Sequence, residues 1–188
     1  MNQLFQKKLS ILPVSKMEDL KEGDHIVVKG KIENLHPSLK PLYFIAKKDY
    51  FHHGIYIGDN EVIDFGGNSK SEAKPRKIDI LQFLSSSSDC KLYRVNDDTG
   101  SKSESCVASI LTRAYTMVED PSKWPEYNMF WNNCESFVNY LKYGEAFTEQ
   151  GKNALHFSLA LLGGASSVVA LSVLSGKVAS QQLTNSGA

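Results

Sequence analysis

The sequence predicts an α+β fold in which an antiparallel sheet packs against helices. Two observations lead to this prediction: β-rich segments come first, between His25 and Val95, and helical periodicity appears only after them, from Val107 onward. Strands followed by helices are typical of α+β domains, whereas parallel sheets arise from alternating strands and helices. A chain of 188 residues is long enough for one such domain with a hydrophobic core, but short for two.

A β-hairpin is the clearest strand signal. The β-rich segments 54–58 and 61–65 flank the dipeptide Asp59-Asn60, which favours a tight turn between two strands. The other expected segments are, in chain order, a strand over 25–29, a loop over 34–41, a turn over 66–69, a polar loop over 85–89, a strand over 91–95 and a polar loop over 96–103.

Two helices are expected after the strands. The first is indicated by five apolar residues that recur at the spacing of one helix face: Val107, Ile110, Leu111, Ala114 and Val118. The second helix is expected to begin at Cys134, after Asn132-Asn133, and to end at Gly144, because glycine readily adopts the left-handed conformation that stops a helix.

The composition excludes some classes of protein. Lys plus Arg and Asp plus Glu each number 21, so the net charge is zero and there is no basic field of the kind that nucleic-acid binding needs. The three cysteines include no CxxC pair, which favours free thiols in a reducing, intracellular compartment. The N-terminal residues lack the long apolar stretch of a secretory signal.

Cys134 is the candidate nucleophile. A thiol at the start of a helix lies near unpaired N–H groups and the positive end of the helix dipole, which favour the thiolate and could stabilise an oxyanion. Asn133 is placed to support that oxyanion or the substrate. Taken alone, Cys134 is also compatible with a buried structural thiol.

His52 is the candidate base, and Asp64 the residue that orients it. Adjacent strand residues point to opposite faces, so only one of His52 and His53 can face the cysteine. A carboxylate at Asp64, on the partner strand, could hold the imidazole in the useful tautomer. Each residue alone also fits a structural role. None of the five histidines has metal-ligand spacing with the cysteines, so we expect no metal and no other cofactor.

Two motifs together resemble the lecithin:retinol acyltransferase-like family. The string from His52 through Gly54-Ile55-Tyr56 to Ile63 is similar to that family's histidine segment, and Asn133-Cys134-Glu135 with Tyr143-Gly144 resembles its cysteine motif. The opening Gly23-Asp24-His25-Ile26 is similar to its first strand. The resemblance spans roughly residues 22–146.

This resemblance implies a circularly permuted papain-like fold of the NlpC/P60 type. It also implies acyl transfer from a glycerophospholipid through a thioester on Cys134, with His52 as general base and acid. Water, an amine or a lysolipid is the implied acceptor. His53 lies at a position that the family fills with an aromatic residue or another histidine, where it could support the substrate.

The chain departs from the family pattern at two positions. Many members carry a second histidine where this chain has Asp64, and a histidine where it has Ser136. An ionised aspartate can orient a histidine, so the expected catalytic set is Cys134, His52 and Asp64.

The expected domains are an N-terminal lead-in over 1–20, a catalytic domain over 21–147 and a hydrophobic tail over 148–188. Residues 153–176 carry no formal charge apart from a possible His156, and as a helix they would reach about 36 Å, enough to cross a bilayer core. The tail is therefore expected to form a C-terminal hydrophobic helix that anchors the protein to a membrane, either spanning it or lying at its surface, with the catalytic domain in the cytosol. A soluble helix packed on the domain is the alternative.

The leading hypothesis is thus a membrane-associated acyltransferase or phospholipase A. Two alternatives remain open from the residues alone. One is a cysteine peptidase or isopeptidase on the same fold, and the other is a catalytically silent, membrane-tethered adaptor.

Overall fold

The computed structural model describes residues 10–31, 50–96, 105–128 and 131–148. A six-stranded sheet with the order β1-β6-β2-β3-β4-β5 organises this part of the chain, and every pair of neighbouring strands is antiparallel. Its strands are β1 (Ile11–Pro13), β2 (His25–Gly30), β3 (Phe51–Tyr56), β4 (Glu61–Gly66), β5 (Lys74–Asp79) and β6 (Ser87–Val95). The helices are α2 (Ile80–Ser85), α3 (Val107–Glu119) and α4 (Cys134–Tyr143), with single 3₁₀ turns η1 (Met17–Asp19), η3 (Lys70–Glu72) and η4 (Pro121–Lys123). The antiparallel sheet with helices confirms the expected mixture of α and β structure.

The β3–β4 hairpin forms as predicted. Asp59 and Asn60 have φ angles of 47° and 59°, in the left-handed region that Asp and Asn tolerate better than most residues. The N–H of Glu61 donates to the carbonyl of Gly58 over 2.8 Å and closes a two-residue turn. This tight connection fixes which residues of β3 lie beside which residues of β4.

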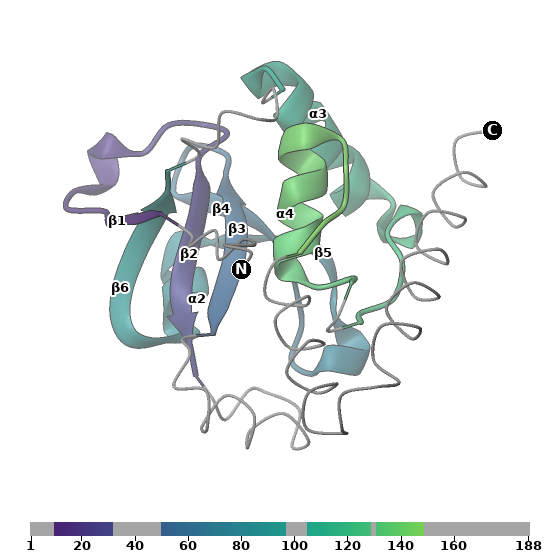
Figure 1. The fold of residues 1–188 in the computed structure, drawn as a ribbon, viewed down its shortest axis with the longest axis horizontal. Coiled ribbons are helices and arrows are strands. Elements are labelled where there is room, and N and C mark those ends of the chain that lie inside the picture. Colours follow the sequence, from purple (N-terminus) through teal and green to yellow (C-terminus); the bar gives the residue numbers. More distant parts are fainter. Residues whose placement is uncertain (1–9, 32–49, 97–104, 129–130, 149–188) are drawn as a thin grey trace, which may run out of the picture. The chain divides into compact units, whose positions relative to one another are not determined.

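The two faces of the sheet bury separate apolar clusters. Because side chains alternate along a strand, Ile55 and Ile63 point to one face, where they pack with residues of α3 and α4. Tyr56 and Val62 point to the other face and pack with residues of α2, including Phe83. Figure 1 shows α3 and α4 together on one side of the sheet. The start of β3 lies near both layers, since the His52 ring packs on Phe83 of α2 and the carbonyl oxygen of Phe51 lies 3.9 Å from Sγ of Cys134 on α4.

The two predicted helices are also confirmed. In α3 the buried residues are Ile110, Ala114 and Met117, whereas Val107, at the start of the predicted apolar face, is 45% exposed. Helix α4 begins at Cys134, as expected, and ends at Gly144, whose φ of 73° is left-handed. The Arg113 guanidinium of α3 donates to the carbonyl of Leu141 and so binds the C-terminal end of α4.

Some expected segments differ from the structure. The serine-rich segment 85–89 was expected to be a loop, but Ser85 ends α2 and Ser87 begins β6, where Ser87 pairs with Gly30 of β2. Strands β1 and β5 and helix α2 were not predicted. The loop over 34–41 and most of the loop over 96–103 lie outside the described residues.

The hydrophobic tail was expected over 148–188. Only Thr148 of this segment belongs to the described residues. Among the helices that the structure describes, none combines the length and the apolar character needed to cross a bilayer.

Candidate functional site

His52 and Asp64 are brought together by the β3–β4 hairpin. In the register of the two strands Gly54 lies opposite Asp64, so His52 is a diagonal neighbour of Asp64 on the same face. The Nε2 atom of His52 lies 2.7 Å from Oδ2 of Asp64. The Asp64 side chain is fully buried and that of His52 is 13% exposed, so this hydrogen bond is largely shielded from solvent. The His52 ring also packs on Phe83 of α2, with centroids 5.2 Å apart.

Arg76 of β5 binds the same carboxylate. It lies directly opposite Asp64 in the β4–β5 pairing. Its Nε donates to Oδ1 of Asp64 over 2.8 Å and its Nη2 to Oδ2 over 3.1 Å, which is the two-point geometry that guanidinium and carboxylate groups favour. Arg76 could not be identified from the sequence, because nothing in the chain marks it as a partner of Asp64 until the strand register is known.

Cys134 is the first residue of α4. Asn133 precedes the helix as its N-cap: its side-chain oxygen accepts from the N–H of Ser136, and the Ser136 hydroxyl accepts from the N–H of Asn133. This capping box fixes the first turn of the helix and hence the direction of the Cys134 side chain. The thiol is buried, and its Sγ lies 3.9 Å from the carbonyl oxygen of Phe51, the residue before His52.

These contacts set the protonation of the site. Burial acts to lower the pKa of His52, but hydrogen bonds with the Asp64 carboxylate and with Cys134 outweigh it and raise that pKa to about 9. Burial acts to raise the pKa of Asp64, but hydrogen bonds from His52 and Arg76 outweigh it and hold that pKa below its ordinary value. At neutral pH the Asp64 carboxylate is therefore ionised and His52 carries a proton.

Asn133 takes part in a second buried network. Its Nδ2 donates to the hydroxyl of Thr148 over 3.0 Å, and that hydroxyl donates to Oε2 of Glu135 over 2.6 Å. Because its oxygen accepts from the N–H of Ser136, the Asn133 side chain helps to fix the backbone conformation around Cys134. The predicted role of Asn133, to support an oxyanion or the substrate, stays a prediction.

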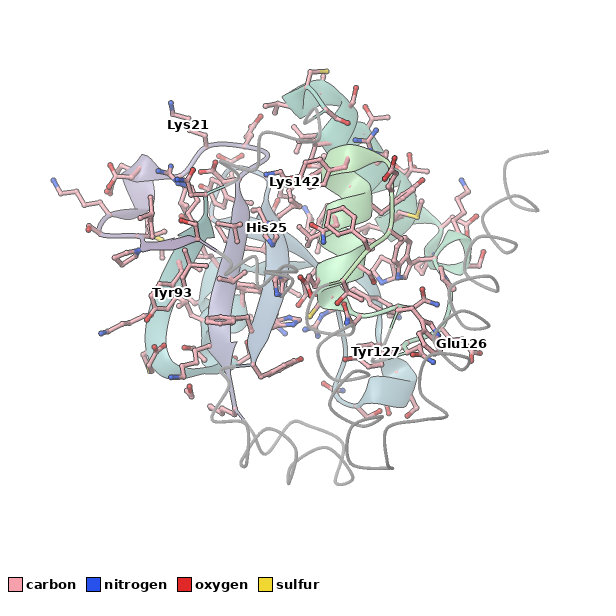
Figure 2. The ribbon with its side chains drawn as sticks, viewed as in Figure 1. Lys21, His25, Tyr93, Glu126, Tyr127 and Lys142 are labelled. Carbon is pink, nitrogen blue, oxygen red and sulfur yellow. The ribbon has the colours of Figure 1, made fainter. Side chains whose placement is uncertain are left out.

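His53 lies on the opposite face of β3 from His52. Its Nδ1 lies 2.8 Å from Nε2 of His25, and both rings are buried. Burial, followed by the nearby charge of His52, lowers the pKa of His53 to about 3. The pKa of His25 is also well below its ordinary value, first through burial and then through its neighbours His53 and Lys142. Figure 2 shows His25 and Lys142 between β2 and α4.

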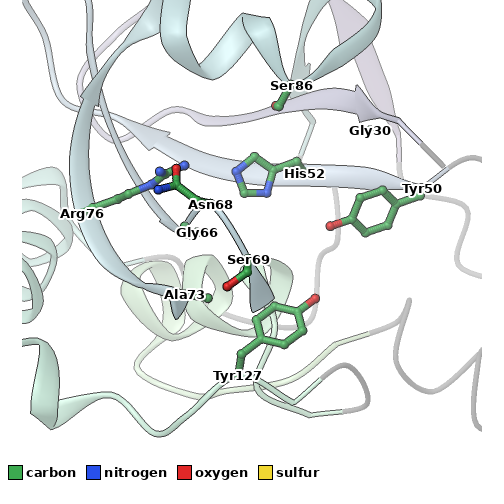
Figure 3. A pocket seen from close by; sticks show the side chains of 11 residues that line it. Gly30, Tyr50, His52, Gly66, Asn68, Ser69, Ala73, Arg76, Ser86 and Tyr127 are labelled. Carbon is green, nitrogen blue, oxygen red and sulfur yellow. The ribbon is translucent and has the colours of Figure 1, made fainter. Parts of the chain in front are cut away.

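A pocket of about 200 Å³ opens beside His52. Polar side chains form much of its wall, including those of Tyr50, Tyr127 and Ser69. In Figure 3 the His52 ring lies along the wall of this pocket, between Arg76 on one side and Tyr50 on the other. His52 is one of the described residues that line this pocket, whereas the buried Cys134 is not.

Comparison with known proteins identifies the family. The family model described as "Lecithin retinol acyltransferase" matches residues 18–147, more than half of the chain. The chain belongs to this family. It is also 28% identical over 123 residues to the human protein "Phospholipase A and acyltransferase 1", covering 59% of this chain and 70% of that relative.

The match to the lecithin retinol acyltransferase family confirms the resemblance that the two motifs indicated. The matched residues 18–147 include His52, His53, Asp64, Asn133 and Cys134. The structure brings His52, Asp64 and Cys134 together and places His53 on the other face of the strand. Among the described residues, no group of three or more His, Cys, Asp and Glu side chains could hold a metal ion.

Proposed function

We propose that this member of the lecithin retinol acyltransferase family is a cysteine-dependent acyltransferase or phospholipase A. Its acyl donor is a glycerophospholipid, and the acyl group passes through a thioester on Cys134. His52 is the general base and acid, and Asp64 orients its ring. The family and the human relative, whose name joins phospholipase A with acyltransferase, support this class of reaction.

The observation that carries the proposal is the position of His52 between Asp64 and Cys134. One ring nitrogen, Nε2, is held by Asp64 at 2.7 Å, which leaves Nδ1 for the thiol. The interaction with Cys134 also contributes to the raised pKa of His52. Since that pKa is about 9, His52 carries a proton at neutral pH. We propose that the partner of this imidazolium is the Cys134 thiolate. A preformed thiolate is the reactive form of a cysteine nucleophile.

The reaction follows from this pair in two steps. The Cys134 thiolate attacks an ester carbonyl of the phospholipid, and the tetrahedral intermediate expels the alkoxide of the lysolipid, which takes the proton from His52. Water, an amine or the hydroxyl of a lysolipid then attacks the thioester while His52 accepts its proton. Collapse of the second intermediate releases the acylated acceptor and restores the thiolate. In this proposal, backbone N–H groups at the start of α4 stabilise both oxyanions.

Two further parts of the proposal concern the whole protein. The antiparallel sheet, with a cysteine at the start of α4 and a histidine on β3, supports a circularly permuted papain-like fold of the NlpC/P60 type. The uncharged segment 153–176 supports a hydrophobic helix that holds the enzyme on an intracellular membrane, with the catalytic domain in the cytosol. A membrane anchor suits an enzyme whose donor stays in the bilayer.

The proposal is tested by lysolipid release from phosphatidylcholine liposomes. We expect the wild-type chain to release lysolipid, and Cys134→Ser and His52→Gln each to abolish nearly all of it. Cys106→Ser is the matched control for the first variant, because Cys106 is a free and exposed cysteine at the N-cap of another helix. We expect this control to retain wild-type turnover, and thermal unfolding should show that every variant is folded at the temperature of the assay.

Activity that survives in both Cys134→Ser and His52→Gln would contradict the proposal. Turnover of peptide amides without a lipid requirement would favour a peptidase or isopeptidase instead. An adaptor would show no turnover at all, with a Cys134 thiol of ordinary reactivity.

A further inference from the structure

Both oxygens of the Asp64 carboxylate are occupied by hydrogen bonds. Arg76 Nε donates to Oδ1 over 2.8 Å, and Arg76 Nη2 donates to Oδ2 over 3.1 Å. The same Oδ2 lies 2.7 Å from Nε2 of His52. One carboxylate oxygen is thus shared between the imidazole and the guanidinium, so the position of Arg76 determines where Oδ2 can lie.

The strand register and a nearby glycine leave room for the Arg76 guanidinium beside Asp64. Asp64 and Arg76 are direct partners across β4 and β5, which puts their side chains on one face. Gly66 leaves the space that the pair occupies, since a Cβ atom there would lie 2.9 Å from Arg76 Nη2 and 3.1 Å from Asp64 Oδ2. A side chain at position 66 would therefore displace the ion pair.

Asp64 needs a second partner because it is fully buried. A single hydrogen bond from His52 would leave Oδ1 without a donor and let the carboxylate turn about its last bond. The planar fork of an arginine fixes a carboxylate in one orientation, which a single-point donor does not. The His52 ring is held in turn by Asp64 on its edge and by Phe83 against its plane.

We propose that Arg76 is a positioning residue for catalysis, which acts through Asp64 to hold His52 in line with Cys134. This inference rests on the proposed function. Arg76 does not touch the reacting atoms in this account. It fixes the orientation of the Asp64 carboxylate and balances its buried negative charge.

The charged and titratable groups around His52 determine how its pKa should respond to the loss of Arg76. Asp64 comes from β4, Arg76 from β5 and Cys134 from α4, while His53 follows on β3 itself. Helix α2 contributes the uncharged Phe83, and the pocket adds the phenol of Tyr50. Without the guanidinium, the negative charge of Asp64 would act on His52 alone and raise the pKa of His52 further.

Two variants separate the charge of Arg76 from its geometry. Arg76→Gln removes both, whereas Arg76→Lys keeps the charge but offers a single-point donor. Lys77→Gln is the matched control, because Lys77 is the next residue on β5 and forms an exposed ion pair with Glu61, far less buried than the Asp64 pair. Each full-length variant is assayed on phosphatidylcholine liposomes and on p-nitrophenyl butyrate, an uncharged ester. The pKa of His52 is followed in parallel by NMR of the histidine rings.

We expect Arg76→Gln to lower kcat on both substrates by about 10- to 100-fold, the loss typical of a small misplacement of a catalytic group. The pKa of His52 and the alkaline limb of the pH profile should move upward. Arg76→Lys should also lower kcat but leave the pKa of His52 near its wild-type value, and Lys77→Gln should match the wild type in both measurements.

Three results would overturn the inference. The first is wild-type kcat in Arg76→Gln and Arg76→Lys. The second is a higher KM for phospholipid with unchanged turnover of p-nitrophenyl butyrate, because Arg76 would then bind the lipid phosphate. The third is a loss of kcat with no change in the pKa of His52 in Arg76→Gln, as expected of a purely structural role. An inactive wild type would instead refute the proposed function, and NMR would still test the link from Arg76 to His52.

Discussion

Nε2 of His52 lies 2.7 Å from Oδ2 of Asp64, twelve positions later in the chain and on the neighbouring strand. The contact is buried and short, and it leaves the other ring nitrogen of His52 for Cys134. Because the carboxylate is ionised, it also stabilises the protonated imidazole. The rate, the pH dependence and the fold stability should all respond to changes around this pair.

Activity should fall on the alkaline side as His52 loses its proton. The pKa of His52 is raised from 6.5 to about 9, so the imidazolium that donates the proton to the leaving group persists below that pH and is lost above it. We expect kcat/KM for phosphatidylcholine to fall about tenfold per pH unit above this pKa. A pH profile of the wild type checks this prediction. An alkaline limb near pH 6.5 would mean that Asp64 and Cys134 do not perturb the histidine.

Asp64→Asn should lower kcat/KM by about 10²- to 10⁴-fold, since it would reverse the hydrogen bond to His52. The amide oxygen is expected to face Arg76, which only donates, and the amide nitrogen would then donate to Nε2. His52 would carry its proton on Nδ1, so it could no longer accept the thiol proton. Steady-state kinetics check the loss. A rate within threefold of the wild type would reduce the site to Cys134 and His52.

Gly54→Ala should destabilise the domain by about 1–3 kcal/mol through overpacking. A Cβ atom there would lie 2.6 Å from Cγ1 of Val62 and 3.0 Å from Cε2 of Phe83, the residue against which His52 packs. Denaturant unfolding measures the stability, and the same sample should show reduced turnover because Phe83 must move.

Gly144→Ala provides the comparison for that substitution. At Gly144 an added Cβ meets nothing within 4 Å, but the φ of 73° disfavours any side chain. We expect this variant to lose about 1 kcal/mol of stability through backbone strain alone, with turnover unchanged. Equal effects of the two substitutions on turnover would contradict the role given to Phe83.

The pair His25 and His53 should make the fold sensitive to acid. Both pKa values are lowered in the folded protein, that of His53 to about 3, so the unfolded chain binds more protons once the pH falls below 6.5. The stability from this pair is therefore present above pH 6.5 and lost as the pH falls. His52 has the opposite shift, and its contribution is already complete below pH 6.5.

Thermal unfolding between about pH 7 and pH 4.5 tests this prediction. The melting temperature of the wild type should fall across this range, and His53→Asn should show a shallower fall. The comparison stays above the ordinary pKa of aspartate, so protonation of Asp64 contributes little. Equal slopes in the two proteins would show that the pair does not control acid stability.

The hairpin and α4 could be predicted from the sequence because their signals are local. Asp59-Asn60 favours a left-handed two-residue turn, and Asn133 before Cys134 favours a helix start. Alternation along β3 also required that His52 and His53 point to opposite faces, and the structure confirms this. The family resemblance then identified which histidine belongs with Cys134.

The pairing of Arg76 with Asp64 could not be predicted, because it depends on β5. The segment Lys74–Asp79 has a proline and three charged residues before its only aliphatic side chain, so it lacks the alternation typical of a strand. It becomes a strand through pairing with β4 at the edge of the sheet, where a proline is tolerated. Ser87–Asp89 is similar: its serines indicate a loop, and pairing with β2 makes it part of β6.

The most direct test of the account is to map the acyl-enzyme. The full-length protein is incubated with phosphatidylcholine liposomes at neutral pH, quenched in acid and analysed by peptide mass spectrometry. We predict a fatty-acyl mass on Cys134, released lysolipid in matching amount, and neither product in His52→Gln. Lysolipid release with no acyl group on Cys134 at any quench time, or with the acyl group on Cys90 or Cys106 instead, would contradict the central claim.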